Sequence, residues 1–216
     1  MSVLVAAVVG LALVFGPWLA APAQAGVPLE QLRAQIDRVL KIVDDPEMKK
    51  DAQAQRRRAA VRKVADYIFD FQETAKRSLA RHWQPRSPAE QAEFVRLFAD
   101  LLERSYISRI ELYGGEKIAY LNDSLDGDQA QVRTRIVTKS GTEVPVDYRM
   151  LKRGERWLVY DVVIEGVSLV ANYRTQFSKI IETASYDELV QKMKGKQTEL
   201  GAAADGQPKK APPGKR

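Results

Sequence analysis

The N-terminal half of the chain spaces its apolar side chains three, four and seven positions apart. Between residues 29 and 43 they form one stripe that stops just before Pro46. This spacing predicts a helix, and the proline marks its end. A second helical stretch begins near Met48, and a third short one ends near Trp83. We therefore expect three helices in the first part of the chain.

The clearest helix start is Ser87-Pro88-Ala89-Glu90. Ser87 can cap the helix, Pro88 suits its first turn, and the side chain of Glu90 can reach back to complete a capping box. The helix that follows carries a broad, partly aromatic stripe as far as Tyr113. The members of this stripe are Phe94, Leu97, Phe98, Leu101, Leu102, Tyr106 and Ile110.

Beyond residue 116 the apolar period changes from 3.6 to 2, which predicts β-strands. The strands expected are residues 117–122, 131–138, 143–151 and 156–165. Three favourable hairpin turns separate them, at Asp126-Gly127, Ser140-Gly141 and Arg153-Gly154. These features predict an antiparallel meander. The last strand is apolar on both faces except at Asp161, so we expect it to be central and covered on both sides.

After Gly166, which breaks the sheet, the pattern from Val167 to Ile181 predicts a helix, and a last helix is expected from about Tyr186 to Lys196. The whole pattern predicts an α+β fold, a curved four-stranded antiparallel meander wrapped by about six helices. An apolar pocket between sheet and helices and an ordinary packed core would give the same periodicity, so the pattern leaves both open.

The first 25 residues carry no charged side chain and end in Ala23-Gln24-Ala25. This composition is typical of a signal peptide, so we expect export to the periplasm and cleavage after about Ala25. An uncleaved anchor is the alternative, because the usual positive n-region is missing. No second apolar stretch of the sequence is long enough to span a bilayer. We expect one domain at residues 26–200 and a disordered basic tail at residues 201–216.

The chain has 216 residues, no cysteine, one histidine and a formal net charge of +6. This composition excludes disulfides and thiolate sites, and we expect no metal and no cofactor. Two basic clusters contribute to the charge: Arg56, Arg57, Arg58, Arg62 and Lys63, and in the tail Lys209, Lys210, Lys215 and Arg216. The first cluster predicts either a solvated helix face or contact with an anionic membrane or acidic partner. Nucleic acid is not expected as a partner of an exported protein.

Three residues were weighed as catalytic candidates. His82 stands beside Trp83 in a proline loop, which favours a surface or half-buried position. Ser168 is not in a nucleophile elbow, because Val170 stands where glycine is required; Ser168 more simply caps the next helix. Asp161 fits a structural hydrogen bond or ion pair better than a catalytic role. We therefore expect no enzyme, whereas a hydrolase would need Asp161 beside Ser168 and open to a cavity.

Three segments carry a family resemblance. They are Phe94-x3-Phe98-x2-Leu101-Leu102-x3-Tyr106 followed by Tyr113, then Val144-Pro145-Val146-Asp147-Tyr148, and then Trp157-x2-Tyr160-Asp161-Val162-x2-Glu165-Gly166-Val167-Ser168-Leu169-Val170 with Tyr173-Arg174-x2-Phe177. Together they resemble the MlaC family, the periplasmic phospholipid-binding components of the Mla lipid-transport system, also known as toluene-tolerance auxiliary proteins. The resemblance covers roughly residues 58–194, and its last segment is the most specific.

The resemblance implies a deep pocket for acyl chains and a shuttle that supports the lipid asymmetry of the outer membrane. Its partners would be phospholipid, an inner-membrane ABC transporter with an MCE-domain ring, and an outer-membrane lipoprotein–porin complex. One branch of the family is associated with hopanoids, so a carrier of hopanoid or another lipid is an alternative, as is a periplasmic adaptor that binds only protein.

A lipid carrier must shelter two acyl chains from water. Exposing about 30 methylene and methyl groups at about 0.8 kcal/mol each would cost about 24 kcal/mol. A cavity on the order of 1,000 Å³ is needed to hold them. The resemblance places Val167 on the pocket wall. The lipid-binding residues expected are Phe94, Phe98, Leu101, Tyr106, Ile110, Ile136, Val146, Tyr148, Val159, Val163, Val167, Leu169, Val170 and Tyr173.

Overall fold

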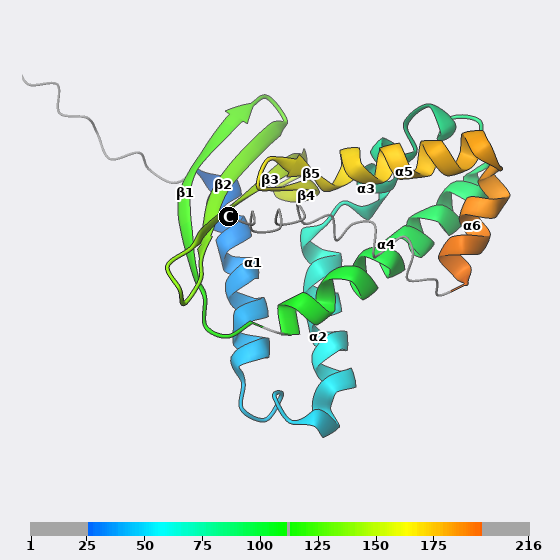
Figure 1. The fold of residues 1–216 in the computed structure, drawn as a ribbon. Helices are drawn as coiled ribbons and strands as arrows, with labels where there is room; N and C mark the ends of the chain where they lie inside the picture. Colours follow the sequence, from blue (N-terminus) through cyan, green and yellow to red (C-terminus); the bar gives the residue numbers. More distant parts are fainter. Residues whose placement is uncertain (1–25, 112, 196–216) are drawn as a thin grey trace, which may run out of the picture.

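The computed structural model of the chain describes residues 26–111 and 113–195, and its layout is drawn in Figure 1. The expected signal peptide and basic tail lie outside the described residues. A twisted sheet stands at one end of the molecule and a bundle of helices at the other (Figure 1). The predicted α+β class is therefore confirmed.

The helices follow the apolar stripes of the sequence. The α-helices are α1 (Val27–Asp44), α2 (Ala54–Ile68), α3 (Phe71–Leu79), α4 (Pro88–Glu111), α5 (Leu169–Thr183) and α6 (Tyr186–Lys194), with short 3-10 turns at Asp51–Gln53 and Ala80–His82. The second expected stretch is interrupted after Ile68. Asp70 ends it by accepting a hydrogen bond from the Glu73 backbone N–H at 2.9 Å, which caps α3.

The strands are β1 (Lys117–Asp126), β2 (Gln129–Val137), β3 (Glu143–Arg153), β4 (Arg156–Ile164) and β5 (Val167–Ser168). They form one sheet in the order β1-β2-β3-β4-β5, with every pairing antiparallel. The four-stranded meander is confirmed. The two-residue strand β5 was missed, because the expected helix began at Val167.

A tight turn produces this extra strand. Glu165 and Gly166 both have positive φ, at 49° and 83°, and fold residues 167–168 back onto β4. Helix α5 then starts two residues later than expected. The hydroxyl of Ser168 accepts a hydrogen bond from the Ala171 N–H at 3.0 Å, so the predicted capping role of Ser168 is confirmed.

Strand β4 is flanked and covered as predicted. It pairs with β3 on one side, and with β5 and a single bridge to Phe69 on the other. One face packs Val159 against α1 and α2. On the other face, the Arg77 guanidinium of α3 lies 4.2 Å from the ring centre of Tyr160. We call the face that packs against α1 the inner face of the sheet.

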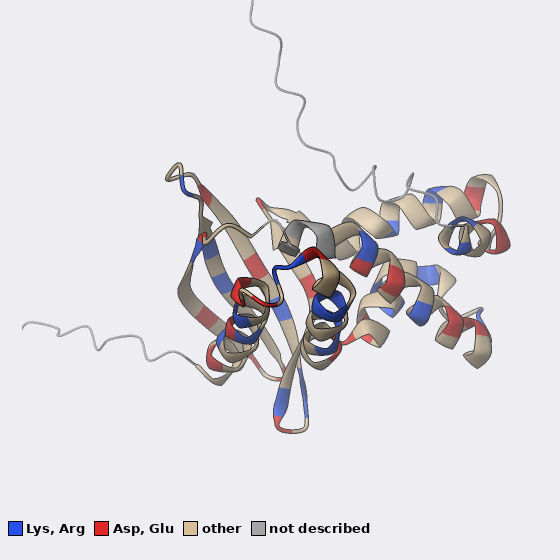
Figure 2. Cartoon of the chain, turned by 90° about the horizontal axis from the view of Figure 1, so that it is seen from below, with Lys and Arg blue, Asp and Glu red and all other residues tan. Residues whose placement is uncertain are grey.

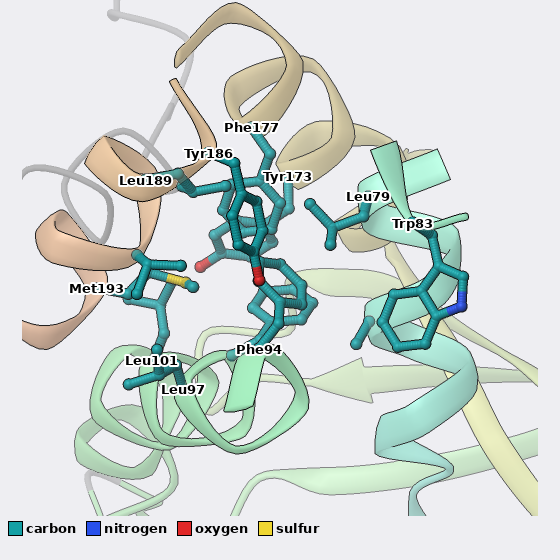
Figure 3. Close-up of a cluster of buried hydrophobic side chains, with 13 residues drawn as sticks. Leu79, Trp83, Phe94, Leu97, Leu101, Tyr173, Phe177, Tyr186, Leu189 and Met193 are labelled. Carbon is teal, nitrogen blue, oxygen red and sulfur yellow. The ribbon is translucent and has the colours of Figure 1, made fainter. Parts of the chain in front are cut away.

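The helical end of the molecule has a dense aromatic core, which we call the helical core (Figure 3). The ring centres of Phe98 and Tyr173 are 5.0 Å apart, those of Phe98 and Phe177 5.2 Å, and those of Phe94 and Phe177 5.5 Å. All three contacts are edge-to-face, the arrangement that aromatic quadrupoles favour. The four rings are at most 1 % exposed. They therefore fill the space between α4 and α5.

The start of α4 carries the predicted capping box. The Glu90 carboxylate accepts from the Ser87 backbone N–H at 2.7 Å, and the Ser87 hydroxyl accepts from the Glu90 backbone N–H at 3.3 Å. The hydrogen bond from the Ser87 backbone lowers the pKa of Glu90.

We expect Ser87→Ala to lower the free energy of unfolding by about 1 kcal/mol. Urea denaturation measures this, with the exposed Ser124→Ala as the control; an unchanged midpoint would contradict the cap.

Candidate functional site

A row of side chains crosses the inner face from one edge of the sheet to the other. Val167 pairs with Ile164 and Ile164 pairs with Val146. Val146 in turn pairs with Thr134, and Thr134 with Tyr120. Directly paired residues of antiparallel strands point to the same side, so all five share the inner face. We call this set the inner-face row.

Exposure falls steeply along the inner-face row. Val167, at the open edge formed by β5, is 59 % exposed, whereas Val146 is 4 % and Thr134 1 % exposed. A single exposed apolar side chain is ordinary on a protein surface, but Val167 directly continues a row of side chains whose next members are buried. The row therefore leads from the surface of the molecule into its interior.

Half-buried apolar side chains gather beside the inner-face row. They come from the sheet and from α1 and α2, and they pack against a buried cluster that includes Leu32, Val132 and Met150. Each retains some accessible surface although it lies between the sheet and the helices. They are Ile36, Val64, Tyr120, Tyr148 and Val162.

Two tyrosines on the inner face have raised pKa values. Burial raises the pKa of Tyr148 to about 12 and is the sole cause of the shift, yet part of its side chain stays accessible. Burial also raises the pKa of Tyr120 well above its usual value, and the nearby carboxylate of Asp37 adds to the shift. The Tyr120 hydroxyl has no hydrogen-bond partner among the described residues. Burial therefore disfavours the charged form of both tyrosines, although the Arg33 guanidinium lies 4.6 Å from the ring centre of Tyr120.

A pocket of about 150 Å³ opens farther along the inner face, between α1, the end of α2 and the β3–β4 hairpin. Its lining residues are Gln31, Leu32, Gln35, Tyr67, Ile68, Met150, Arg156 and Trp157. Polar groups at its rim are already paired: Gln31 accepts from the Trp157 N–H at 2.9 Å, and Arg156 stacks on the Tyr67 ring. This volume is far below the order of 1,000 Å³ expected for two acyl chains.

The structure divides the expected lipid-binding residues. Phe94, Phe98, Leu101 and Tyr173 belong to the helical core and are 0–4 % exposed, so they line no accessible surface. Their role as lipid-binding residues stays a prediction, but they do not face the sheet in this structure. The physical reason is that α4 packs against α2, α3 and α6, and its aromatic stripe meets α5.

The inner face holds Ile136, Val146, Tyr148, Val159 and Val167, as the register shows. A bulge in β4 interrupts the alternation of its side chains between the two faces of the sheet. Arg149 pairs with Asp161, but the next residue, Met150, pairs with Val159, so one residue of β4 is skipped in the pairing.

Val163 consequently pairs with Asp147 and lies on the face opposite Tyr148, and its expected contact with lipid stays a prediction. The inner-face residues Val162 and Ile164 were missed for the same reason. The sequence pattern does not predict this bulge.

The other expected residues lie at the ends of helices. Ile110, in the last turn of α4, packs against the buried pair Val43 and Val61 of α1 and α2. Val170 is buried at the start of α5. Tyr106 and Leu169 are half-buried.

Asp161 is the buried hub of the β4–α5 junction, 3 % exposed. Its carboxylate accepts hydrogen bonds from the Ser168 hydroxyl at 2.7 Å, the Val170 N–H at 3.0 Å and the Arg149 guanidinium at 3.0 Å. The predicted structural hydrogen bond and ion pair are therefore both confirmed.

Asp161 does stand beside Ser168, as a hydrolase would require. The acid, however, has both oxygens occupied and sits closed in the fold. His82 is half-buried next to Arg81, consistent with its predicted position. Within residues 26–111 and 113–195, no cluster of three metal-ligating side chains occurs.

Charged residues of both signs are interspersed over α1 and α2 (Figure 2). Arg62, one of the expected basic cluster, forms ion pairs with Asp66 at 3.1 Å, with Asp100 at 3.3 Å and with Glu103. Arg56 and Lys63 are exposed. Part of this cluster therefore fastens α2 to α4. None of the helices in the described part of the chain has the length and apolarity needed to cross a membrane.

Comparison with known proteins adds independent information. The family model of the MlaC protein matches residues 33–195. The chain is 25 % identical over 120 residues to the intermembrane phospholipid transport system binding protein MlaC of Haemophilus influenzae, covering 53 % of this chain and 56 % of that protein. It is 22 % identical over 161 residues to the toluene tolerance protein ttg2D of Pseudomonas putida, covering 70 % and 72 %. It thus spans little more than half of the Haemophilus protein.

A solved structure is similar over most of its length. This is the phospholipid-binding protein of Ralstonia solanacearum in complex with a phospholipid, with 26 % identity and a TM-score of 0.69. The similarity covers 78 % of this chain and 95 % of that one. The family match takes in nearly all of the described fold, including the inner-face row and the Asp161 junction. By this match the chain belongs to the MlaC family.

Proposed function

We propose that this protein binds a phospholipid on the inner face of its sheet and carries it across the periplasm. The inner-face row carries the proposal: apolar side chains lead from the exposed edge at Val167 to the enclosed surroundings of Tyr120 and Tyr148. The similar Ralstonia protein was solved with a phospholipid, which supports the same class of cargo here.

The acyl chains need more room than the pocket of about 150 Å³ offers. The buried side chains form three separate clusters, one in the helical end, one between α1 and the sheet, and one between α1 and α2. The second cluster is the one that acyl chains would enter, because Leu29 and Leu32 of α1 meet Val132 and Met150 of the sheet there. We infer that the α1–α2 pair moves away from the inner face when lipid enters, while the helical core stays closed.

The proposed route runs between an inner-membrane ABC transporter with an MCE-domain ring and an outer-membrane lipoprotein–porin complex. The signal peptide expected at residues 1–25 supports a periplasmic location. The closed environment of Asp161 supports a carrier rather than an enzyme, because its carboxylate is occupied by three donors. The acyl chains would run past Val167 along the inner-face row, and the phospholipid head group would lie in solvent outside that edge.

Native mass spectrometry of the exported protein, followed by organic extraction, tests the proposal. We expect a bound species of phospholipid mass at close to one per chain, because returning two acyl chains to water would be costly. Two intact acyl chains in the extract would also argue against hydrolysis. Protein that carries no lipid would favour the adaptor alternative, and a pentacyclic hydrocarbon would favour hopanoid cargo; either result overturns phospholipid as the cargo.

A further inference from the structure

A carboxylate from the sheet fastens the first residue of the described fold. Asp123 of β1 accepts a hydrogen bond from the Gly26 backbone N–H at 3.0 Å through Oδ1, and one from the Leu29 N–H at 3.3 Å through Oδ2. Gly26 is the N-cap residue of α1 and has no side chain to cap with. Asp123 thus supplies from another element both contacts that a capping box makes within a helix.

This contact is so close that it restricts residue 26. A Cβ atom added to Gly26 would lie 2.2 Å from Oδ2 of Asp123, much nearer than atoms can approach. The backbone there is ordinary, with φ of −76°, so a larger residue would be resisted only by the need to displace the Asp123 carboxylate from this contact. The position directly after Ala25 is therefore shaped around Asp123.

The same position is where the sequence predicts cleavage. Ala23-Gln24-Ala25 has the small residues that signal peptidases need before the cut bond. Cleavage there converts the Gly26 amide N–H into an α-ammonium group with three donors and a positive charge. We propose that removal of the signal peptide at this bond creates an ion pair between the Gly26 ammonium and the Asp123 carboxylate, which strengthens the attachment of α1 to the sheet in the mature protein.

Electrostatics makes the two partners depend on each other. A positive charge at the N-terminus of a helix opposes the helix dipole and by itself weakens α1. Asp123 reverses this effect, because a charge-assisted hydrogen bond is about twice as strong as a neutral one. Since Leu29 and Leu32 of α1 cover the inner face, the ion pair would hold the first turn of α1 on the sheet when the rest of the α1–α2 pair moves aside for lipid. This inference rests on signal-peptide removal and not on lipid binding.

The test compares two leaderless chains that run to Arg216, one beginning at Gly26 and one keeping Ala25 as the first residue, each verified by intact mass. Thermal unfolding is measured at neutral pH and low salt. We expect the Gly26 chain to have a Tm about 2–4 °C higher, because its ammonium meets Asp123 directly. The same pair is then made with Asp123→Asn, where we expect the advantage to vanish or reverse.

Each result decides the proposal. Equal Tm values for the first pair, or an advantage that survives Asp123→Asn, would show that no such ion pair stabilises α1. The mass of the protein recovered from the periplasm after export of the full chain is the second measurement. We expect it to begin at Gly26, and a different first residue would overturn the proposal even if lipid binding is intact.

Discussion

Val167→Glu is expected to remove bound phospholipid while leaving the protein folded. Val167 is 59 % exposed, so a glutamate there stays solvated in the empty protein and costs little stability. In the loaded protein the same carboxylate would stand against acyl chains at the start of the inner-face row. Burying an unpaired charge costs several kcal/mol, and each 1.4 kcal/mol is a factor of ten in affinity. We therefore expect the lipid-to-protein ratio to fall at least about tenfold.

The matched control is Leu121→Glu. Leu121 is 48 % exposed and lies on β1, at the opposite edge of the same sheet. It offers the same change of charge and a similar exposure, without a place at the β5 edge. Native mass spectrometry gives the lipid ratio, and circular dichroism gives the Tm of each variant. If Val167→Glu keeps its lipid, or if both variants lose it equally, the entry of lipid at the β5 edge is wrong.

Much of the fold is present in the sequence as local patterns. The change of period near residue 116 separates helices from strands, and the glycine-containing turns fix a meander with one order of strands. The capping box at Ser87 predicts the exact residue at which α4 begins. These features act over four to eight positions, so a single sequence displays them in full.

The candidate site is less readable, because it depends on which elements face each other. The aromatic stripe of α4 would pack equally well on a sheet or on a helix, and only the fold shows that Phe98 meets Phe177 of α5. The bulge in β4 shifts the side-chain alternation by one residue, so that Val163 points away from the inner face. Strand β5 needs a left-handed turn at Glu165, a conformation that side chains disfavour and that local propensity does not predict.

The β4–α5 junction links the proposed lipid-binding edge to a buried polar contact. The same turn places Val167 on the inner face and Ser168 beside Asp161. Asp161 stabilises this turn by accepting hydrogen bonds. Its carboxylate reaches the hydroxyl that caps α5, the Val170 N–H of the first turn and the Arg149 guanidinium of β3. A shift of this turn would move the edge of the proposed site without changing any residue that touches lipid.

Asp161→Ala is therefore expected to be severely destabilising. It leaves the buried Val170 N–H without an acceptor, at a cost of about 1–3 kcal/mol, and weakens the cap made by Ser168, which adds about 1 kcal/mol. The total of about 3 kcal/mol corresponds to a fall in Tm of roughly 10 °C for a chain of this size. Thermal and urea unfolding measure the loss.

Asp147→Ala is the matched control for this change. Asp147 of β3 also faces away from the inner face, but among the described residues its carboxylate accepts one side-chain hydrogen bond, from Gln131 at 2.8 Å, and it is half-buried. We expect its loss to cost less than about 1 kcal/mol, as for other partly exposed polar contacts. If Asp161→Ala is as mild as Asp147→Ala, the carboxylate is not what positions α5. The hydrogen bonds that Asp161 accepts from β3 and from the start of α5 account for its burial beside Ser168.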